Sequence, residues 1–245
     1  MKNNSKSTPP THLAFIMDGN RRWAKAHKLE TLMGHNRGAE RIETIVEAAA
    51  KMKIPYVTFW AFSTENWNRE KVEVEMLMKV FRDVLSGPMA ARLIKNGVKL
   101  QIIGDFSKFP KDIALGLEKL MEASKGNTRI TANIALNYGG RGEILGAVNK
   151  LLEITPQGHG SSGPESGMTN LVDEETFSSY LFTKDQPDPD MIIRTGGEQR
   201  LSGFLPWQAV YSELYFTDVL WPDFDEEAFE KAISEFAHRQ RRFGK

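Results

Sequence analysis

Residues 12–17 read HLAFIM, and Asp18-Gly19-Asn20-Arg21-Arg22 follows without a break. A short and almost continuous apolar run is typical of a strand whose two faces are both covered, as in parallel sheets. The polar segment behind it then begins at the carboxyl end of that strand. This order, a buried strand followed by charged and polar residues, recurs along the chain and decides the fold class.

Strand-like runs of this kind alternate with helical patterns. Strands are predicted at residues 12–17, 56–62, 98–103, 130–136, 191–194 and 214–216. Apolar residues recur with the helical period around residues 39–52, 113–121 and 229–237. The alternation predicts a single α/β domain with a central, mostly parallel six-stranded sheet and helices on both faces.

The composition is that of a globular protein without a bias toward polyanions. The chain has 245 residues, 40% of them hydrophobic, and its 32 basic residues balance 32 acidic ones. We therefore expect no nucleic-acid partner. Cysteine is absent, which excludes disulfides and thiolate chemistry and fits a reducing compartment, so we expect a cytoplasmic protein.

Two segments bear on the domain limits, and the longest apolar runs bear on membranes. No apolar run approaches the roughly 20 residues of a membrane-spanning helix, so membrane contact would be peripheral at most. Residues 1–11 are polar and contain two prolines, and we interpret them as a disordered tail before a domain at residues 12–245. Residues 155–170 are rich in Gly, Ser and Pro and predict a mobile internal loop.

Ligands of open parallel sheets bind beyond the carboxyl ends of the strands, and residues 18–23 follow such an end. The Asp18 carboxylate could hold magnesium, Gly19 would let the backbone approach an anion, and Arg21 and Arg22 could bind that anion. Alternatively, the segment is a turn that caps a helix, with both arginines in solvent. The local chemistry alone does not decide between these interpretations.

Two more polar segments follow predicted strands. Residues 61–69 (AFSTENWNR) suit a substrate site, but their composition favours a capped helix start with Trp67 in the core. Between Arg194 and Arg200, a double glycine suits the capture of a diphosphate by guanidinium groups. The alternative, a glycine turn with surface arginines, does not explain why so polar a loop leads into the apolar residues 204–207.

Two weaker patterns are rejected. Residues 140–146 resemble a dinucleotide-binding glycine pattern, but the third glycine falls one residue late, and no P-loop motif occurs. The histidines show no metal-ligand spacing. A nucleotide-binding regulator is therefore disfavoured.

The polar segments together resemble the signature regions of the cis-prenyltransferase (isoprenyl transferase) family. The matching stretches are residues 15–23, 34–38, 61–69, 133–141, 193–207, 213–225 and 241–244. The resemblance extends from about residue 12 to the end of the chain.

The resemblance implies an α/β fold, usually in a homodimer, with an apolar cleft for a prenyl chain. It also implies magnesium-dependent condensation of isopentenyl diphosphate onto an allylic diphosphate, such as farnesyl or geranyl diphosphate. The product would be a polyprenyl diphosphate with Z double bonds. The alternative is a non-catalytic partner subunit of a prenyltransferase complex, although such relatives tend to lose the Asp-Gly-Asn loop that this chain keeps.

Residue roles carry over position by position. The resemblance implies Asp18 and Asn66 as catalytic residues, and Asp18 and Glu213 as magnesium ligands. Because an amide is a poor base, we expect Asn66 to orient the substrate while a diphosphate oxygen takes the proton. The implied substrate-binding residues are Gly19, Asn20, Arg21, Arg22, Trp23, His35, Ser63, Thr64, Glu65, Trp67, Arg69, Arg194, Arg200, Leu201 and Ser202, with Arg242 and Gly244 reaching across from the partner subunit. The cleft walls are expected to include Val98, Ile130 and Ala132.

Four positions depart from the usual pattern of the family. Arg21 stands where glycine is often found, and Thr31 replaces a common arginine, which removes one cation that Arg21 or Arg37 could replace. Gln199 stands for a histidine sometimes credited with a metal contact, and Gly203 stands for asparagine. None of these changes removes the aspartate or the arginines on which the implied chemistry depends.

Overall fold

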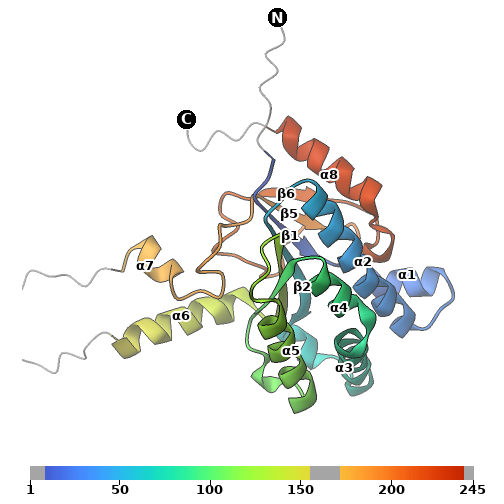
Figure 1. Cartoon of the computed structure of the whole chain (residues 1–245), viewed down its shortest axis with the longest axis horizontal. Coiled ribbons are helices and arrows are strands. Elements are labelled where there is room, and N and C mark those ends of the chain that lie inside the picture. Colours follow the sequence, from blue (N-terminus) through green and yellow to red (C-terminus); the bar gives the residue numbers. More distant parts are fainter. Residues whose placement is uncertain (1–8, 155–171, 240–245) are drawn as a thin grey trace, which may run out of the picture.

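The computed structural model describes residues 9–154 and 172–239 (Figure 1). In this part of the chain, six parallel strands form one sheet in the order β3-β4-β2-β1-β5-β6. The strands are β1 (His12–Ile16), β2 (Tyr56–Ser63), β3 (Val98–Ile103), β4 (Ile130–Tyr138), β5 (Met191–Arg194) and β6 (Glu213–Phe216). The predicted six-stranded sheet is confirmed, and each of its pairings is parallel.

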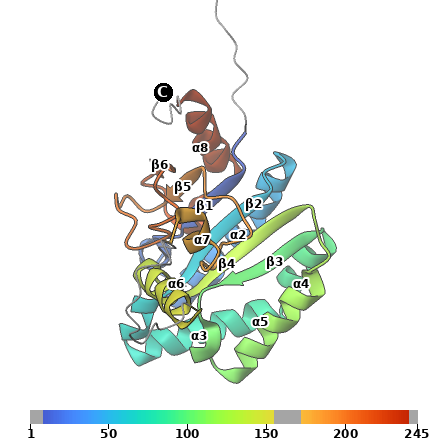
Figure 2. The same cartoon turned by 90° about the vertical axis from the view of Figure 1, so that its left-hand side faces the viewer.

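Helices cover both faces of the sheet, as predicted. They are α1 (Asn20–Ala26), α2 (Thr31–Lys51), α3 (Lys71–Ser86), α4 (Pro88–Lys95), α5 (Lys111–Ser124), α6 (Gly140–Ile154), α7 (Glu174–Ser178) and α8 (Glu226–His238), with short 3-10 turns η1 (Thr64–Asn68), η2 (Phe106–Lys108) and η3 (Trp221–Asp223). In Figure 1, α2, α3, α4, α5 and α8 lie on one side of the strands, and α6 and α7 lie on the other; the turned view of Figure 2 agrees.

Successive residues of β1 face opposite sides of the sheet. Leu13 and Phe15 belong to the larger core, where Phe15 stacks on Phe59 with ring centroids 4.9 Å apart. Ala14 and Ile16 belong to a second core on the other face. Burial on both faces explains why this strand reads as an apolar run without alternation.

The parallel topology brings the carboxyl ends of the strands to one edge of the sheet. Ile16, at the end of β1, pairs with Trp60 of β2 on one side and with Arg194 of β5 on the other. The polar segments that follow these three strands therefore meet, although they are far apart in the sequence.

Several helical regions differ from the prediction. The helix expected around residues 39–52 begins at Thr31, and its first turns show no apolar stripe because they pack closely against α1 and η3. A Cβ atom at Gly38 would lie 2.3 Å from Asn20 Oδ1. No helix was predicted for residues 71–95, which form α3 and α4, for residues 140–154, which form α6, or for residues 174–178, which form α7.

Some predictions concern residues outside the described part of the chain. These are most of the tail at residues 1–11, the whole loop at residues 155–170, and the residues Arg242 and Gly244. Where the described chain begins, the backbone N–H of Thr11 donates to Asp190 Oδ2 at 2.6 Å. Within the described ranges, no helix has both the length and the apolar character needed to cross a membrane.

Candidate active site

A pocket of about 640 Å³ opens at the carboxyl edge of the sheet, beyond β1, β2 and β5. The predicted residues that line it are Asp18, Gly19, Asn20, Arg21, Arg22, His35, Ser63, Glu65, Asn66, Arg69, Arg194 and Ser202. The structure thus gathers residues from all three polar segments of the sequence at one place.

Asp18 lies between two arginines. Its Oδ2 accepts a hydrogen bond from Arg194 Nη2 at 3.1 Å, and its Oδ1 lies 3.3 Å from Arg22 Nη2. Its backbone carbonyl accepts hydrogen bonds from the Thr195 hydroxyl at 2.7 Å and from the Trp221 N–H at 3.0 Å. The carboxylate is therefore held in place just beyond the end of β1.

Arg194 is a buried cation at the end of β5, with only 6% of its side chain exposed. Its Nη1 donates to the Arg200 carbonyl at 2.5 Å and to Ser202 Oγ at 2.9 Å. Its Nε is buried and has no hydrogen-bond partner among the described residues. A buried guanidinium with an unpaired donor favours the binding of an anion in the pocket.

Arg22 contacts the backbone of the loop after β5. Arg22 Nη1 donates to the Gly196 carbonyl at 2.6 Å. Gly196 has φ +83°, and a Cβ atom there would lie 2.4 Å from Arg22 Nη2. Glycine is therefore needed at this position both for the backbone conformation and for the close approach of the guanidinium.

A second pair of arginines shares one carboxylate. Arg69 Nη1 lies 2.7 Å from Glu73 Oε1, and Arg21 Nη1 lies 3.4 Å from Glu73 Oε2. His35 is close to all three: its burial and then the Arg69 guanidinium lower the pKa of His35 to about 4, against the opposing charge of Glu73. His35 is thus neutral at pH 7, and its buried Nε2 has no partner among the described residues.

The segment after β2 forms the 3-10 turn η1 and lines the pocket at the same time. Ser63 and Asn66 form a capping box, in which Asn66 Oδ1 accepts from the Ser63 N–H at 2.8 Å. Burial raises the pKa of Glu65, but hydrogen bonds from its own N–H and from the hydroxyls of Ser63 and Thr64 outweigh burial and lower it below the usual value. The pocket therefore contains a fixed amide and an ionised carboxylate in this segment.

An apolar cleft of about 140 Å³ adjoins the polar pocket. Five residues line both the pocket and the cleft: Met17, Asn20, His35, Ala61 and Leu77. The deeper walls come from α3, α4, α5, β3 and β4. The predicted apolar cleft is thus present, and it opens directly into the cluster of cations.

The expected walls of the cleft are only partly right. Ala132 lines the cleft on β4, together with Ile134 and Leu136. The prediction is wrong for Val98 and Ile130, which are buried in the main core and do not line the cleft. They are the first residues of β3 and β4, and so they lie at the edge of the sheet farthest from the pocket.

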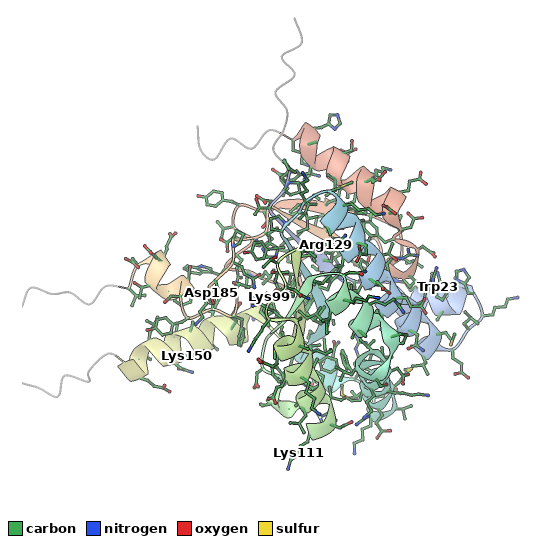
Figure 3. All side chains as sticks on the ribbon, viewed as in Figure 1. Trp23, Lys99, Lys111, Arg129, Lys150 and Asp185 are labelled. Carbon is green, nitrogen blue, oxygen red and sulfur yellow. The ribbon has the colours of Figure 1, made fainter. Side chains whose placement is uncertain are left out.

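Two predicted tryptophans do not line the pocket. The indole of Trp23 donates to Asp223 Oδ1 at 2.7 Å, at the outer side of α1 (Figure 3). Trp67 packs edge-on against Phe62 and donates to Asn137 Oδ1 at 2.9 Å. The alternative interpretation of Trp67 as a core residue matches this packing.

Three further predicted side chains also lie outside the pocket lining. Thr64 donates to Glu65 Oε1 at 3.0 Å and would contact a Cβ atom at Gly139, so it supports the segment from behind. Arg200 contributes its carbonyl to Arg194, but its exposed side chain pairs with Glu198. Leu201 packs against the second core.

Glu213 lies at the opposite end of the sheet from Asp18 within one protomer. It opens β6 beside Met191, the first residue of β5, and its Oε2 lies 2.9 Å from Arg239 Nη1. Asp18, by contrast, follows the last residue of β1. A metal site shared by these two carboxylates therefore does not form within a single chain.

Six residues that line the pocket were not predicted as site residues, namely Ile16, Met17, Trp60, Ala61, Leu77 and Glu198. Glu198 and Ala61 lie in segments that were already singled out. Leu77 follows Glu73 by one helical turn on α3, a relation that becomes visible only once this helix is assigned.

The donors present fit a magnesium ion that arrives with a diphosphate. Among the described residues, no group of three or more His, Cys, Asp or Glu side chains could hold a metal ion by itself. Magnesium in phosphate-transfer sites is usually held by one or two carboxylates together with substrate phosphates. Asp18, on the pocket wall, meets that requirement.

Sequence comparisons identify relatives over nearly the full chain. Residues 16–244 match a family model described as "Putative undecaprenyl diphosphate synthase". An isoprenyl transferase of Neisseria gonorrhoeae is 44% identical over 236 residues, which cover 96% of this chain and 90% of that protein. An isoprenyl transferase of Fusobacterium nucleatum is 45% identical over 235 residues, with 96% of each chain covered.

Two solved structures share the fold. The lavandulyl diphosphate synthase of Lavandula x intermedia, solved with dimethylallyl diphosphate, gives a TM-score of 0.88 at 34% identity, covering 97% of this chain and 99% of that chain. A probable undecaprenyl diphosphate synthase of Campylobacter jejuni gives a TM-score of 0.77 at 30% identity, covering 97% and 100%. With an arginine-lined pocket that opens into an apolar cleft, this chain belongs to the undecaprenyl diphosphate synthase (cis-prenyltransferase) family of isoprenyl transferases, enzymes of prenyl chain condensation.

Proposed function

We propose that the enzyme condenses isopentenyl diphosphate with an allylic diphosphate, such as farnesyl or geranyl diphosphate, in a magnesium-dependent reaction. The product is a polyprenyl diphosphate whose new double bonds have Z geometry, a stereochemistry that rests on the family alone. The observation that carries the proposal is the wall shared by the polar pocket and the apolar cleft. A substrate with an anionic head and a long apolar tail matches that junction.

The two substrates divide the pocket between them. The allylic diphosphate places its tail in the cleft and its head near Arg21, Arg22 and His35, which lie at or beside the junction. Isopentenyl diphosphate binds at Arg194 and Ser202, where the buried guanidinium has an unpaired Nε donor. Holding both substrates at one place converts a bimolecular reaction into an effectively unimolecular one.

The reaction breaks the allylic carbon–oxygen bond, and the diphosphate leaves with the electron pair. The π electrons of isopentenyl diphosphate then form the new carbon–carbon bond, and loss of a proton from the adjacent carbon restores a double bond. The arginines of the pocket stabilise the negative charge that develops on the leaving diphosphate. Magnesium held by Asp18 would supply further charge stabilisation at the same oxygens.

Asn66 orients the substrate, and a diphosphate oxygen accepts the proton. Support comes from the capping box, since Asn66 Oδ1 already accepts a hydrogen bond from the Ser63 N–H. An amide is also a much weaker base than a diphosphate oxygen. The side-chain NH₂ of Asn66 remains to donate to substrate.

We propose a homodimer as the working form. Any contribution of Glu213 to magnesium binding would have to come across a subunit contact, because this residue is remote from Asp18 within one protomer. Arg242 and Gly244 are proposed to reach the site of the partner subunit. A cytoplasmic location stays a prediction from the composition.

The purified protein tests the proposal directly. Incubation with radiolabelled isopentenyl diphosphate, farnesyl diphosphate and magnesium should yield labelled lipid, and chelation of the metal should abolish it. Asp18→Ala should reduce turnover at least ~100-fold, because it removes the fixed carboxylate next to the leaving group. Asp83→Ala, which removes an exposed carboxylate on α3, is the matched control and should keep full activity.

Two results would contradict the proposal. Appreciable condensation by Asp18→Ala in saturating magnesium would show that the reaction does not require the Asp18 carboxylate. No labelled lipid from the folded wild-type protein with any allylic primer would favour the non-catalytic partner subunit instead. Chromatography of the dephosphorylated products then gives the preferred primer and the chain length.

A further inference from the structure

Glu73 lies in the first turn of α3 and joins two arginines of the pocket. Its Oε1 is 2.7 Å from Arg69 Nη1, and its Oε2 is 3.4 Å from Arg21 Nη1. Only 17% of its side chain is exposed, against 33% for Arg69 and 62% for Arg21. A carboxylate in the first turn of a helix is also favoured by the helix dipole, so the position of Glu73 is doubly supported.

The two arginines line the pocket, whereas Glu73 does not. The carboxylate therefore contacts the guanidinium groups from behind and leaves their remaining donors directed at the pocket. Without the Glu73 carboxylate, the repulsion between the guanidinium groups of Arg21 and Arg69 would drive these two side chains apart. Glu73 makes it possible for both cations to be close together before an anion binds.

This corner of the pocket is where the apolar cleft begins. His35, whose pKa responds to the charges of Arg69, Glu73 and Arg21, lines both the pocket and the cleft. Leu77, one turn after Glu73 on α3, also lines both. The diphosphate at this corner is therefore that of the substrate whose tail occupies the cleft.

We propose that Glu73 is a positioning residue that presents Arg21 and Arg69 jointly to the diphosphate of the allylic substrate. This inference rests on the proposed function. It gives Arg21, an arginine where the family often has glycine, a defined partner on α3. Glu73 touches no substrate; it acts through the two guanidinium groups.

Glu73→Gln tests the role because it keeps the size of the side chain and removes its charge. The KM for farnesyl diphosphate should rise about tenfold, the effect of losing one charge-assisted contact, while kcat and the KM for isopentenyl diphosphate stay unchanged. The Kd of the unreactive analogue farnesyl thiolodiphosphate, measured by calorimetry, should rise by the same factor. Glu75→Gln, an exposed glutamate on the same helix, should change none of these values.

A second test measures the effect of Glu73→Gln in an Arg21→Gly background. If Glu73 only stabilised the fold, this effect would be the same in both backgrounds. In the Arg21→Gly background Glu73 holds a single arginine, so Glu73→Gln should raise the KM for farnesyl diphosphate by less than it does in the wild type. An unchanged KM and Kd for the allylic ligands in Glu73→Gln would overturn the inference. So would a fall in kcat alone, or an equal rise of both KM values. Absence of condensation by the wild type would instead count against the proposed function, and calorimetry with the analogue would still decide on Glu73.

Discussion

His12 is buried as a neutral ring at the start of β1. Its Nδ1–H donates to the Pro187 carbonyl at 2.7 Å, so its Nε2 accepts from the Thr58 hydroxyl, also at 2.7 Å. Burial lowers the pKa of His12 to about 4, although the Pro187 carbonyl and Asp190 oppose the shift. The folded state therefore excludes a proton that the unfolded chain would bind.

This exclusion predicts a stability that falls with acid. The unfolded ring takes up a proton below its ordinary pKa of 6.5, and the folded ring does so only near 4. The stability from this group is thus complete above pH 6.5 and is lost progressively as the pH falls toward 4, by about 3 kcal/mol in total. His12→Gln should have a shallower dependence of the unfolding free energy on pH between 5 and 6.5, measured by urea titration.

An exposed histidine provides the control for His12. His27→Gln, at an exposed ring on α1's C-terminal side, should keep the wild-type dependence. His35, the other histidine with a pKa lowered to about 4, accounts for a remaining slope in His12→Gln. A His12→Gln variant whose pH dependence equals that of the wild type would show that His12 does not bear the effect.

Single residues of the site could be predicted where the family motif and the end of a strand coincide. Asp18 lies just beyond the end of β1, Arg194 ends β5, and Ser202 lies in the loop after β5; all three line the pocket. For Trp67 the composition predicted the core position in which it packs, whereas the motif did not tell which side of a short turn its side chain occupies. Glu73 was missed because no helix was predicted for residues 71–86, so its i,i+4 relation to Arg69 was not visible, and because Arg21 is 52 residues away in the sequence.

At the scale of elements, the loop after β5 is the part of the site most dependent on its backbone. Gly196 and Gly203 both have positive φ, at +83° and +87°. They differ in their surroundings: a Cβ atom at Gly196 would lie 2.4 Å from Arg22 Nη2, whereas one at Gly203 would meet no atom within 4 Å. Substituting alanine at each glycine therefore distinguishes the effect of backbone strain, which both substitutions cause, from the effect of displacing Arg22, which only the substitution at Gly196 causes.

Gly196→Ala should be damaging in two ways. Alanine at positive φ costs about 1–2 kcal/mol of stability, and its Cβ would push Arg22 away from Asp18 and from the carbonyl of residue 196. We expect a lower melting temperature and a large loss of turnover in the condensation assay. Gly203→Ala should lower the melting temperature by a similar amount and keep most of the activity. Equal activities of the two folded variants would disprove the importance of the Arg22 contact.

The elements themselves were predictable to different degrees. Strands β3 and β5 have the predicted bounds, because each apolar run ends at a polar or glycine-rich segment. Strands β2 and β4 extend beyond the prediction to Ser63 and Tyr138, since their last residues pair with each other across a register shift that no local pattern reveals. Helices α3 and α4 are separated by Gly87, and Pro88 is the first residue of α4, a signal that the sequence does contain.

At the scale of the molecule, α6 extends away from the sheet (Figure 1) and carries exposed apolar side chains. Leu145 and Leu152, seven residues apart and so on one face, are each 62% exposed. Val210 and Tyr211, in the segment before β6, are 71% and 70% exposed. Exposed apolar side chains of this size favour association, and the proposed homodimer would cover them.

Leu145→Glu should therefore convert the proposed dimer into a monomer, because it would place a charge in the apolar contact between the subunits. Size-exclusion chromatography with light scattering measures the mass directly. Leu115→Glu, a similarly exposed leucine at 56% on α5, lies on the other side of the sheet and should leave the mass unchanged. A wild-type protein that is monomeric at assay concentrations would refute the proposed assembly.

The alternation of strands and helices was sufficient to predict an open parallel sheet, and the family resemblance was sufficient to predict the site at one edge of it. The order of the strands could not be predicted, because β1 and β5 pair across more than half of the chain without a local signal. For the same reason the sequence did not reveal that Glu213 begins its strand far from Asp18.

In the proposed reaction, the wall shared by the pocket and the cleft sets the direction in which the prenyl chain grows. Each new isoprene unit is inserted beside Asp18, so the units added earlier must slide past Leu77 toward Leu93 and Leu120. The reacting end stays where it is, and the oldest end advances into the interior. Such an enzyme has no need to count its additions, because elongation stops when the leading methyl groups meet side chains that cannot yield.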